Sequence, residues 1–264
     1  YKLKRKMKFV IDIFNTFRNN KNKESLPTML DVIQISYHEE SADENFEILQ
    51  MFAPHAKRVQ GVTGIFHAHK AAAELSETKN FYVIDADAVI DEQFKFDFKP
   101  SSEKLEYGHV PQTECVYTWR SRNPVNDLLY GYGGAKLFPR RALLDAKNWN
   151  VDMTTTLGCS FVPKFQISNT TAFNTTPFDA WKSAFRECTK LASSIIPNND
   201  NTDNEYRLDV WCTRGQNQLN GEYCILGARQ GADFGKTYKN NLKALKKIND
   251  FDWLRQTFQD ATEE

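Results

Sequence analysis

Two carboxylates placed two residues apart, Asp85 and Asp87, are the side chains of this sequence best arranged for chemistry. They follow the apolar run Phe81-Tyr-Val-Ile84, and residues i and i+2 of an extended segment point to the same side. Two close carboxylates repel each other unless a positive charge neutralises them. Oxygen ligands with no cysteine or histidine beside them suit Mg²⁺ or Mn²⁺, which proteins commonly share with substrate phosphates. The pair therefore predicts a divalent cation that holds a diphosphate.

Other interpretations of the pair stay open. Asp-x-Asp after a strand also occurs as turn and capping chemistry. The motif also resembles that of haloacid-dehalogenase-type phosphohydrolases, in which Asp85 would attack phosphorus. That motif usually lies on the first strand and needs a downstream Asp-Asp, whereas here two strand–helix units precede it and no Asp-Asp occurs. A non-catalytic nucleic-acid module that uses the basic N-terminal segment is a further hypothesis.

The elements that precede the pair predict an α/β domain. Strands are expected over 31–37, 56–62 and 81–85, and helices over about 42–52 and 66–75. Ser41 and Glu44 have the spacing of a capping box at the start of the first helix. Strand–helix alternation of this kind builds a Rossmann-like nucleotide-binding sheet, in which ligands bind at the carboxyl ends of the strands.

The second half has a more mixed pattern. Strands are expected over 115–120 and 135–138, on either side of the glycine-rich loop 130–134. Thr176-Pro177 opens a helix that runs to about Ser194, with Asp179 in its first turn. The sequence further predicts a polar loop over 198–204, and one or two helices with a basic face over 236–258.

Composition and charge limit the classes of protein. The chain has 264 residues, 41% of them hydrophobic and 26% charged, and a formal net charge of zero. These values fit an ordinary globular protein and exclude a strongly basic chain held on nucleic acid by charge alone. No apolar run is long enough for a membrane span, so no membrane partner is expected. Five cysteines without a Cys-x-x-Cys motif suggest free thiols in a reducing compartment, and hence a cytoplasmic protein.

Charge is unevenly distributed along the chain. Residues 1–23 form a basic N-terminal segment with a net charge of +7, residues 24–110 carry −9 and residues 111–264 carry +2. We interpret 24–110 and 111–264 as two halves of the same domain. A family resemblance assigns a role to each half.

Five segments in a fixed order carry that resemblance, which covers about residues 30–260. They are Gly64-Ile-Phe-His-Ala-His-Lys70, Phe81 to Asp87, Asn123-Pro-Val-Asn126, Tyr130 to Arg140, and Phe185-Arg-Glu-Cys-Thr-Lys-Leu191. The order of elements resembles A-type (GT-A) glycosyltransferases, and the segments resemble their TET-associated, base-J-glucosyltransferase-like branch. The resemblance implies a UDP-sugar donor, a Mn²⁺ or Mg²⁺ cofactor, and the hydroxymethyl group of 5-hydroxymethylcytosine or 5-hydroxymethyluracil in DNA as the acceptor. A glycosyltransferase with a non-DNA acceptor stays an alternative.

The resemblance also implies that 24–110 is a nucleotide-sugar-binding half and 111–264 the acceptor-binding and catalytic half of the same domain. It further implies roles for individual residues. Asp85 and Asp87 would bind the metal, and the donor would contact Ser36, Tyr37, Lys70, Gly133 and Gly134. Asp179 is the candidate base for an inverting transfer, with Glu187 as the reserve. Acceptor DNA would contact Arg120, Arg122, Lys136, Arg207 and Arg214.

The chain departs from the family pattern at two places. Ala135 and Lys136 follow the glycine-rich loop, where some sugar transferases have an acidic base. No histidine follows His109, so the third metal ligand of many A-type enzymes has no counterpart. His67 and His69 face different sides of their expected helix and are interpreted as bystanders.

Overall fold

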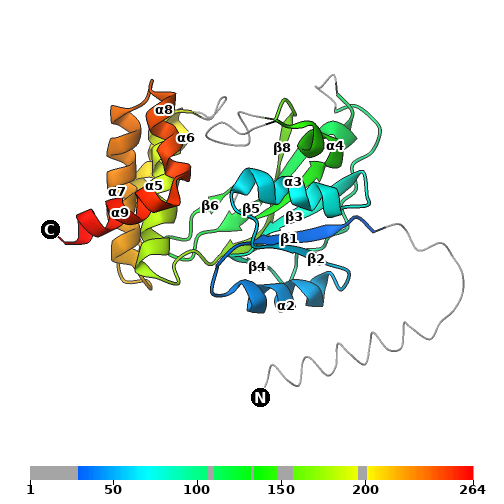
Figure 1. Cartoon of the computed structure of the whole chain (residues 1–264), viewed down its shortest axis with the longest axis horizontal. Coiled ribbons are helices and arrows are strands. Elements are labelled where there is room, and N and C mark those ends of the chain that lie inside the picture. Colours follow the sequence, from blue (N-terminus) through cyan, green and yellow to red (C-terminus); the bar gives the residue numbers. More distant parts are fainter. Residues whose placement is uncertain (1–28, 106–109, 132–133, 148–156, 196–200, 264) are drawn as a thin grey trace, which may run out of the picture.

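The structure, a computed structural model, describes residues 29–105, 110–131, 134–147, 157–195 and 201–263. These residues form a mixed β-sheet with helices on both faces, and a group of helices that packs beside it (Figure 1). The basic N-terminal segment 1–23 and Gly133 lie outside the described residues. Within those ranges, no helix has the length and apolar character that crossing a membrane requires.

The alternation predicted for the first half is confirmed. Its elements are β1 (Val32–Ser36), α2 (Ala42–Phe52), β2 (Lys57–Gln60), α3 (Ile65–Leu75) and β3 (Asn80–Asp85). Strand β1 pairs in parallel with β2 on one side and with β3 on the other. The chain passes from β1 to β2 on one side of β1 and then to β3 on its other side. The strand order therefore reverses between β1 and β3, and sheets of this kind bind ligands at the carboxyl ends of the strands beside such a switch point.

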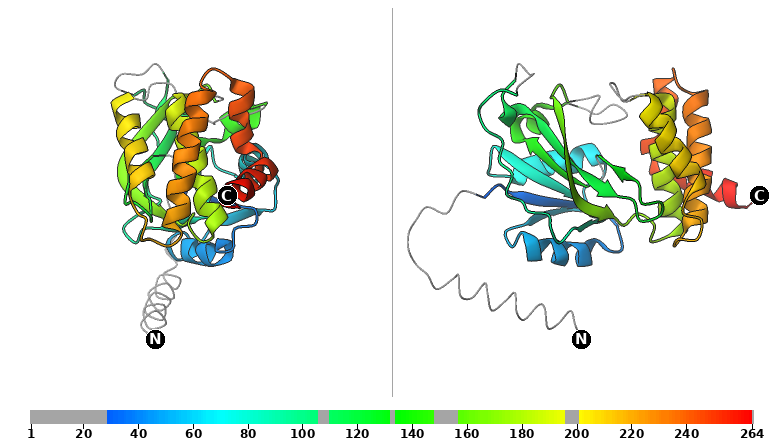
Figure 2. Two further views of the ribbon diagram at one scale, coloured as in Figure 1. Left: turned by 90° about the vertical axis from the view of Figure 1, so that its left-hand side faces the viewer. Right: turned by 180° about the vertical axis from the view of Figure 1, so that it is seen from behind.

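The rest of the sheet is mixed, with the strand order β2-β1-β3-β7-β5-β8-β4. The added strands are β4 (Ala88–Ile90), β5 (Val116–Arg122), β6 (Leu129–Tyr130), β7 (Ala135–Pro139) and β8 (Phe161–Thr171). Strand β7 is antiparallel to both β3 and β5, whereas β8 is parallel to β5. Strand β4 pairs with the end of β8 and brings Asp87 beside it, where Ala172 N donates to Asp87 O at 2.6 Å. Figure 2 shows the sheet from behind.

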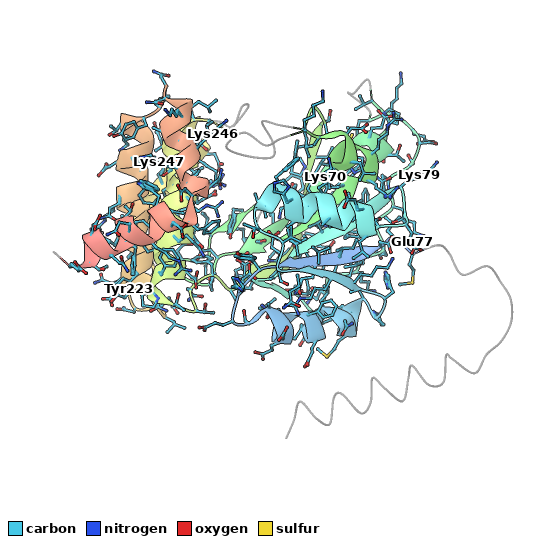
Figure 3. The ribbon with its side chains drawn as sticks, viewed as in Figure 1. Lys70, Glu77, Lys79, Tyr223, Lys246 and Lys247 are labelled. Carbon is cyan, nitrogen blue, oxygen red and sulfur yellow. The ribbon has the colours of Figure 1, made fainter. Side chains whose placement is uncertain are left out.

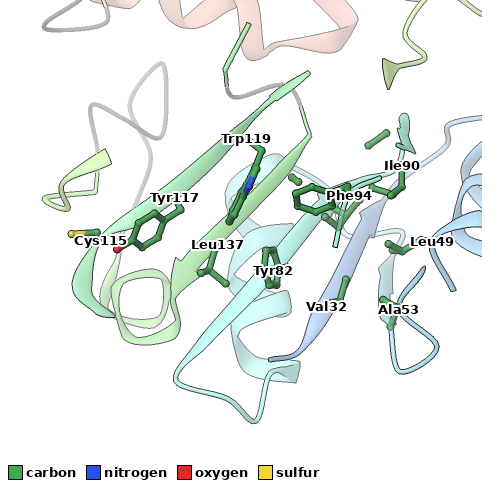
Figure 4. Close-up of a cluster of buried hydrophobic side chains, with 14 residues drawn as sticks. Val32, Leu49, Ala53, Tyr82, Ile90, Phe94, Cys115, Tyr117, Trp119 and Leu137 are labelled. Atoms are coloured by element: carbon green, nitrogen blue, oxygen red, sulfur yellow. The ribbon is translucent and has the colours of Figure 1, made fainter. Parts of the chain in front are cut away.

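Two apolar layers hold the helices against the sheet. On one face, Leu49 and Ala53 of α2 pack on Tyr82, Trp119 and Leu137. Figure 4 shows this cluster in close-up. On the other face, Ala72 of α3 and Leu143 of α4 (Arg140–Asp145) pack on a second cluster that includes Phe81, Val83 and Phe138. Strand β3 is buried by both layers, as its nearly continuous apolar sequence predicts.

The helical unit contains α5 (Pro177–Ser193), α6 (Asn201–Thr213), α7 (Gly221–Thr237), α8 (Leu242–Leu245), the 3₁₀ helix η3 (Lys246–Asn249) and α9 (Phe251–Thr262). Tyr223 lies in this unit and Lys70 on α3 (Figure 3). The predicted start of α5 is confirmed, because Thr176 caps it and Pro177 opens it. Two expectations are wrong. Helix α6 begins inside the expected loop 198–204, and the Ser41 side chain does not cap α2 but accepts a hydrogen bond from Asn45.

Glycines allow α7 to lie directly on α5. A Cβ atom added to Gly227 would collide with the carbonyl oxygen of Trp181, and one added to Gly231 with that of Phe185. A Cβ atom added to Gly235 would likewise collide with the carbonyl oxygen of Thr189. Their spacing of four residues places these glycines on one face of α7. The close contact explains why a helix tolerates so many glycines here.

We expect Gly231→Ala to destabilise the protein by about 2 kcal/mol, because the added methyl group must push α7 away from α5. Thermal unfolding monitored by circular dichroism would measure the loss. Ala228→Gly is a suitable comparison, since it removes helix propensity and a buried methyl group without a collision. An alanine variant at Gly231 with unchanged stability would show that the two helices separate at little cost.

Candidate functional site

The carboxylate pair lies at the carboxyl edge of the sheet, as predicted. Asp85 is the last residue of β3 and is the register partner of Ile35 in β1. Asp87 lies two residues further on, in the turn that leads to β4. Both side chains are half-buried. The pair therefore borders the switch point between β1 and β3.

Lys136 is the nearest positive charge to the pair. Its Nζ lies 2.6 Å from Asp85 Oδ2, and its side chain is only 3% exposed. The antiparallel register of β3 and β7 sets Lys136 opposite Val83, two residues before Asp85. The other oxygen, Asp85 Oδ1, is buried and makes no hydrogen bond within the described part of the chain. One oxygen of this carboxylate is thus paired with Lys136, and the other has no hydrogen-bond partner among the described residues.

Asp87 has an unusual ionisation for an aspartate. Its pKa is raised from 3.8 to about 7, firstly by burial and secondly by the negative charges of Asp85 and Glu39. The positive charges of Lys136 and Lys182 oppose this rise. A carboxyl group with such a pKa gains strongly from a cation placed beside it. The electrostatics therefore fit a cation-binding role for Asp87.

We predict that Asp87 makes the protein less stable as pH rises from about 4 to about 7. Over this range the folded state, with its raised pKa, binds more protons than the unfolded chain, so the free energy of unfolding falls with pH. The melting temperature of Asp87→Asn should therefore rise relative to that of the wild type between about pH 4 and pH 7. Above pH 7 the difference between the two should stay constant. The exposed Asp97→Asn serves as the control. A difference that does not change with pH would contradict the raised pKa.

His69 is fully buried on α3, and the charges of Lys136 and Asp85 act on it. The interpretation of His67 and His69 as bystanders stays untested. Burial and the charge of Lys136 lower its pKa to about 4, while Asp85 acts in the opposite direction. Its Nδ1 lies 2.9 Å from the carbonyl oxygen of Ile65. The imidazole is therefore neutral at physiological pH.

The residues predicted to bind the donor are divided between two places. Tyr37 follows β1 and is 44% exposed, with its hydroxyl accepting from Thr63 Oγ1 at 3.4 Å. Ser36 is buried, and its Oγ accepts from Arg58 Nε at 2.8 Å. Lys70 points to the carbonyl oxygen of Ala146 at 3.4 Å, on the outer side of α3. Tyr37 thus remains accessible for stacking, whereas Ser36 and Lys70 already have protein partners.

Gly134 is explained by packing inside the protein. A Cβ atom at this position would collide with the side-chain amide of Asn169. That amide is buried and hydrogen-bonds to Ser121, Ser168 and Thr171. The glycine therefore lets the chain pass a buried polar network. The prediction that Gly134 approaches a sugar stays untested.

Both candidate bases belong to α5, and both are ion-paired. Asp179 accepts from Thr176 Oγ1 at 2.7 Å and lies 2.6 Å from Lys182 Nζ. Glu187 lies 2.7 Å from Arg207 and 2.9 Å from Lys190. The side chain of Asp179 is 34% exposed and that of Glu187 is 16% exposed. Of the two, Asp179 is the more accessible to an acceptor.

Most of the side chains predicted to contact DNA have partners within the protein. Lys136 is buried against Asp85, so it belongs to the acidic pair rather than to a DNA surface. Arg207 is held by Glu187, Arg122 lies 3.7 Å from Asp127, and the Arg120 guanidinium lies 4.8 Å above the exposed Phe165 ring. Arg214 is exposed just after α6. The predicted set is therefore mostly engaged in other contacts.

Three residues that the sequence did not single out also lie near the pair. The charge of Lys182 acts on Asp87 from α5. The half-buried Tyr130 hydrogen-bonds the side chain of Thr171, the register partner of Ala88, and the charges of Glu187 and Asp87 act on its hydroxyl. Lys136 carries a sequence signal, as a lysine inside the apolar run 135–138, but the partner predicted for it is DNA.

The residues present fit a divalent cation that is shared with a substrate. In the described ranges, no three His, Cys, Asp or Glu side chains come close enough to hold a metal ion by themselves. Mg²⁺-type sites often use one or two carboxylates and complete their coordination with phosphates and water. Asp87 and the unpaired Oδ1 of Asp85 offer such a partial set. Two hollows of the described surface lie on the helical unit, and neither is lined by Asp85 or Asp87.

No family model matches this chain, and no curated protein matches its sequence. The structure shows a mixed α/β fold with an acidic pair at the switch point of its sheet.

Proposed function

We propose that the protein is a UDP-sugar glycosyltransferase of the GT-A type, which transfers a sugar to the hydroxymethyl group of 5-hydroxymethylcytosine or 5-hydroxymethyluracil in DNA. The carrying observation is the position of Asp85 and Asp87 at the sheet's switch point, beside the buried cation of Lys136. Open α/β sheets bind nucleotides at this edge. The family resemblance supplies the sugar donor and the DNA acceptor.

The donor would lie across the ends of β1 and β3. Tyr37 has the exposure needed to stack on the uracil ring. Asp87 and Asp85 Oδ1 would hold Mn²⁺ or Mg²⁺, which supplies positive charge against the leaving diphosphate. Lys136 adds a fixed positive charge of its own at the same place. Together these groups favour departure of UDP.

The acceptor would enter between the sheet and the helical unit. Asp179 would accept the proton of the hydroxymethyl oxygen while that oxygen forms its bond to the sugar carbon and the bond from that carbon to UDP breaks. Lys182, which holds Asp179 at 2.6 Å and also acts on Asp87, would keep the base oriented toward the site. In duplex DNA, the hydroxymethylated pyrimidine must first be flipped out of the base stack to reach this site.

A transfer assay tests this proposal. UDP release is measured for a set of UDP-sugars, UDP-arabinose and UDP-glucose included, with Mn²⁺ and an oligonucleotide that contains 5-hydroxymethylcytosine or 5-hydroxymethyluracil. The matched oligonucleotide with unmodified pyrimidines is the acceptor control. We expect UDP release and a mass increase of the DNA only with a hydroxymethylated strand, reduced at least about 100-fold in Asp179→Asn.

Other outcomes would point elsewhere. UDP release without any gain in DNA mass would indicate a transferase with a different acceptor. Release of inorganic phosphate from a generic phosphate ester, lost in Asp85→Asn, would indicate a phosphohydrolase that uses Asp85 as its nucleophile. Either result would overturn the DNA-modifying function.

A further inference from the structure

Five lysines gather where α7 ends and α8 begins. Residues 236–247 contain them all and no acidic residue, and each of the five is exposed. We call this the C-terminal lysine surface, and its members are Lys236, Lys239, Lys243, Lys246 and Lys247. Figure 3 labels Lys246 and Lys247 at one end of the helical unit. No comparable run of like charge occurs elsewhere among the described residues.

These lysines do not neutralise acidic side chains of the protein. Among the described residues, none of the five forms an ion pair, whereas Lys182 and Lys190 of α5 are both paired with carboxylates. One contact is to an aromatic ring, with Lys247 Nζ 5.5 Å from the centre of Trp253. A concentrated set of unpaired cations attracts polyanions.

The fold holds this surface in a fixed position. Leu245 and Ile248 are buried between its lysines, in a cluster with Trp181 and Phe185. Arg186 donates to the carbonyl oxygen of Ile248 at 2.8 Å and to Asn249 Oδ1 at 3.0 Å. A shallow hollow lined by residues 236–241 lies in the same surface, and Tyr238 is 38% exposed there. The lysines are therefore presented on an ordered support.

We propose that the C-terminal lysine surface binds the phosphate backbone of nucleic acid. Unpaired lysines beside an exposed tyrosine and asparagines are the groups that contact phosphate and sugar without reading sequence. An anionic membrane would require a continuous apolar face beside the charge. Leu245 and Ile248 are buried instead, and the exposed large hydrophobic residues of 236–247 are Tyr238 and Leu242 alone. The identification of the nucleic acid as acceptor DNA rests on the proposed function.

Helix α5 joins the C-terminal lysine surface to the candidate base Asp179. Arg186, which hydrogen-bonds Ile248 and Asn249 beside the lysines, lies seven residues after Asp179 on this helix. Seven residues of an α-helix rise about 10 Å along its axis.

Charge reversal with a matched control tests the proposal. One variant carries Lys239→Glu, Lys243→Glu and Lys246→Glu, and the other carries Lys79→Glu, Lys95→Glu and Lys99→Glu, which are exposed lysines of the sheet unit. Both have the same net charge. Binding of a fluorescent duplex is measured by anisotropy at several salt concentrations without UDP-sugar, after circular dichroism has shown that both variants fold.

We expect the first variant to lose at least tenfold in affinity at about 0.15 M salt, and its salt slope to fall by about 2 to 3, since each lost phosphate contact removes about 0.9. The control variant should bind nearly as the wild type does. Equal losses in both variants, or none, would overturn the proposal. So would a loss confined to binding of vesicles of anionic phospholipid, which would indicate a membrane surface. Because no sugar transfer is measured, a failed glycosyltransferase assay would leave this result unaffected.

Discussion

Asp87→Asn is expected to reduce sugar transfer at least about 100-fold and to raise the melting temperature at pH 7.5. Asparagine keeps the shape of the side chain but removes the negative charge that a cation bound to a diphosphate needs. The same change removes the cost of holding a carboxylate in a half-buried place beside Asp85, which is the cause of the raised pKa of Asp87. UDP release and thermal unfolding, measured on one preparation, would check both effects.

The opposite directions of these two effects make the prediction specific. A purely structural aspartate would lose stability together with activity when its charge is removed. Asp97→Asn, an exposed aspartate outside the site, should change neither quantity. An Asp87→Asn protein that retains full transfer activity would remove Asp87 from the mechanism, and one that is less stable at neutral pH would show that its carboxylate makes a favourable contact.

Lys136→Met is expected to lower the free energy of unfolding by about 3 kcal/mol, because it leaves Asp85 without its buried partner. The melting temperature should fall by about 10 °C. Mn²⁺ should restore part of this loss, since the uncovered Asp85 and its neighbour Asp87 then form an unneutralised pair. The measurement is the rise in melting temperature that Mn²⁺ produces in each protein. We expect a larger rise in Lys136→Met than in the wild type.

The double variant Asp85→Asn, Lys136→Met separates charge from packing. Removing both partners of a buried ion pair is often nearly neutral, so this protein should regain most of the stability and lose the enhanced response to Mn²⁺. If the single and double variants are equally unstable, Lys136 contributes through its aliphatic packing. In that case the internal neutralisation of Asp85 is of little importance.

Local pattern was sufficient to predict the first half of the fold. The strand β3 is an apolar run, and the helices on either side of β2 carry apolar faces. The alternation of strands and helices, and their order along the chain, therefore follow from the sequence. In the second half, β8 contains Pro163 and alternates weakly, and α7 carries four glycines. Local pattern treats such residues as breakers. The contact of α7 with α5 explains three of those glycines, Gly227, Gly231 and Gly235.

The site was predictable in part for the same reason. Asp85 and Asp87 lie on one local segment, so their common position at the sheet edge follows from strand geometry. The partnership of Asp85 with Lys136 depends on the antiparallel register of β3 and β7, which are far apart in sequence. The ion pairs of Asp179 and Glu187 likewise depend on how α5 and α6 pack. Register and helix packing are properties of the whole fold and cannot be inferred from spacing.

The most direct test of the central claim is calorimetric titration of UDP into the wild type and Asp87→Asn, each with Mn²⁺ and with the chelator EDTA. If Asp85 and Asp87 bind a diphosphate through a cation, UDP should bind to the wild type only with Mn²⁺, and Asp87→Asn should bind it weakly or not at all. Binding of equal strength in all four conditions, or no binding of UDP to the wild type with Mn²⁺, would contradict the claim.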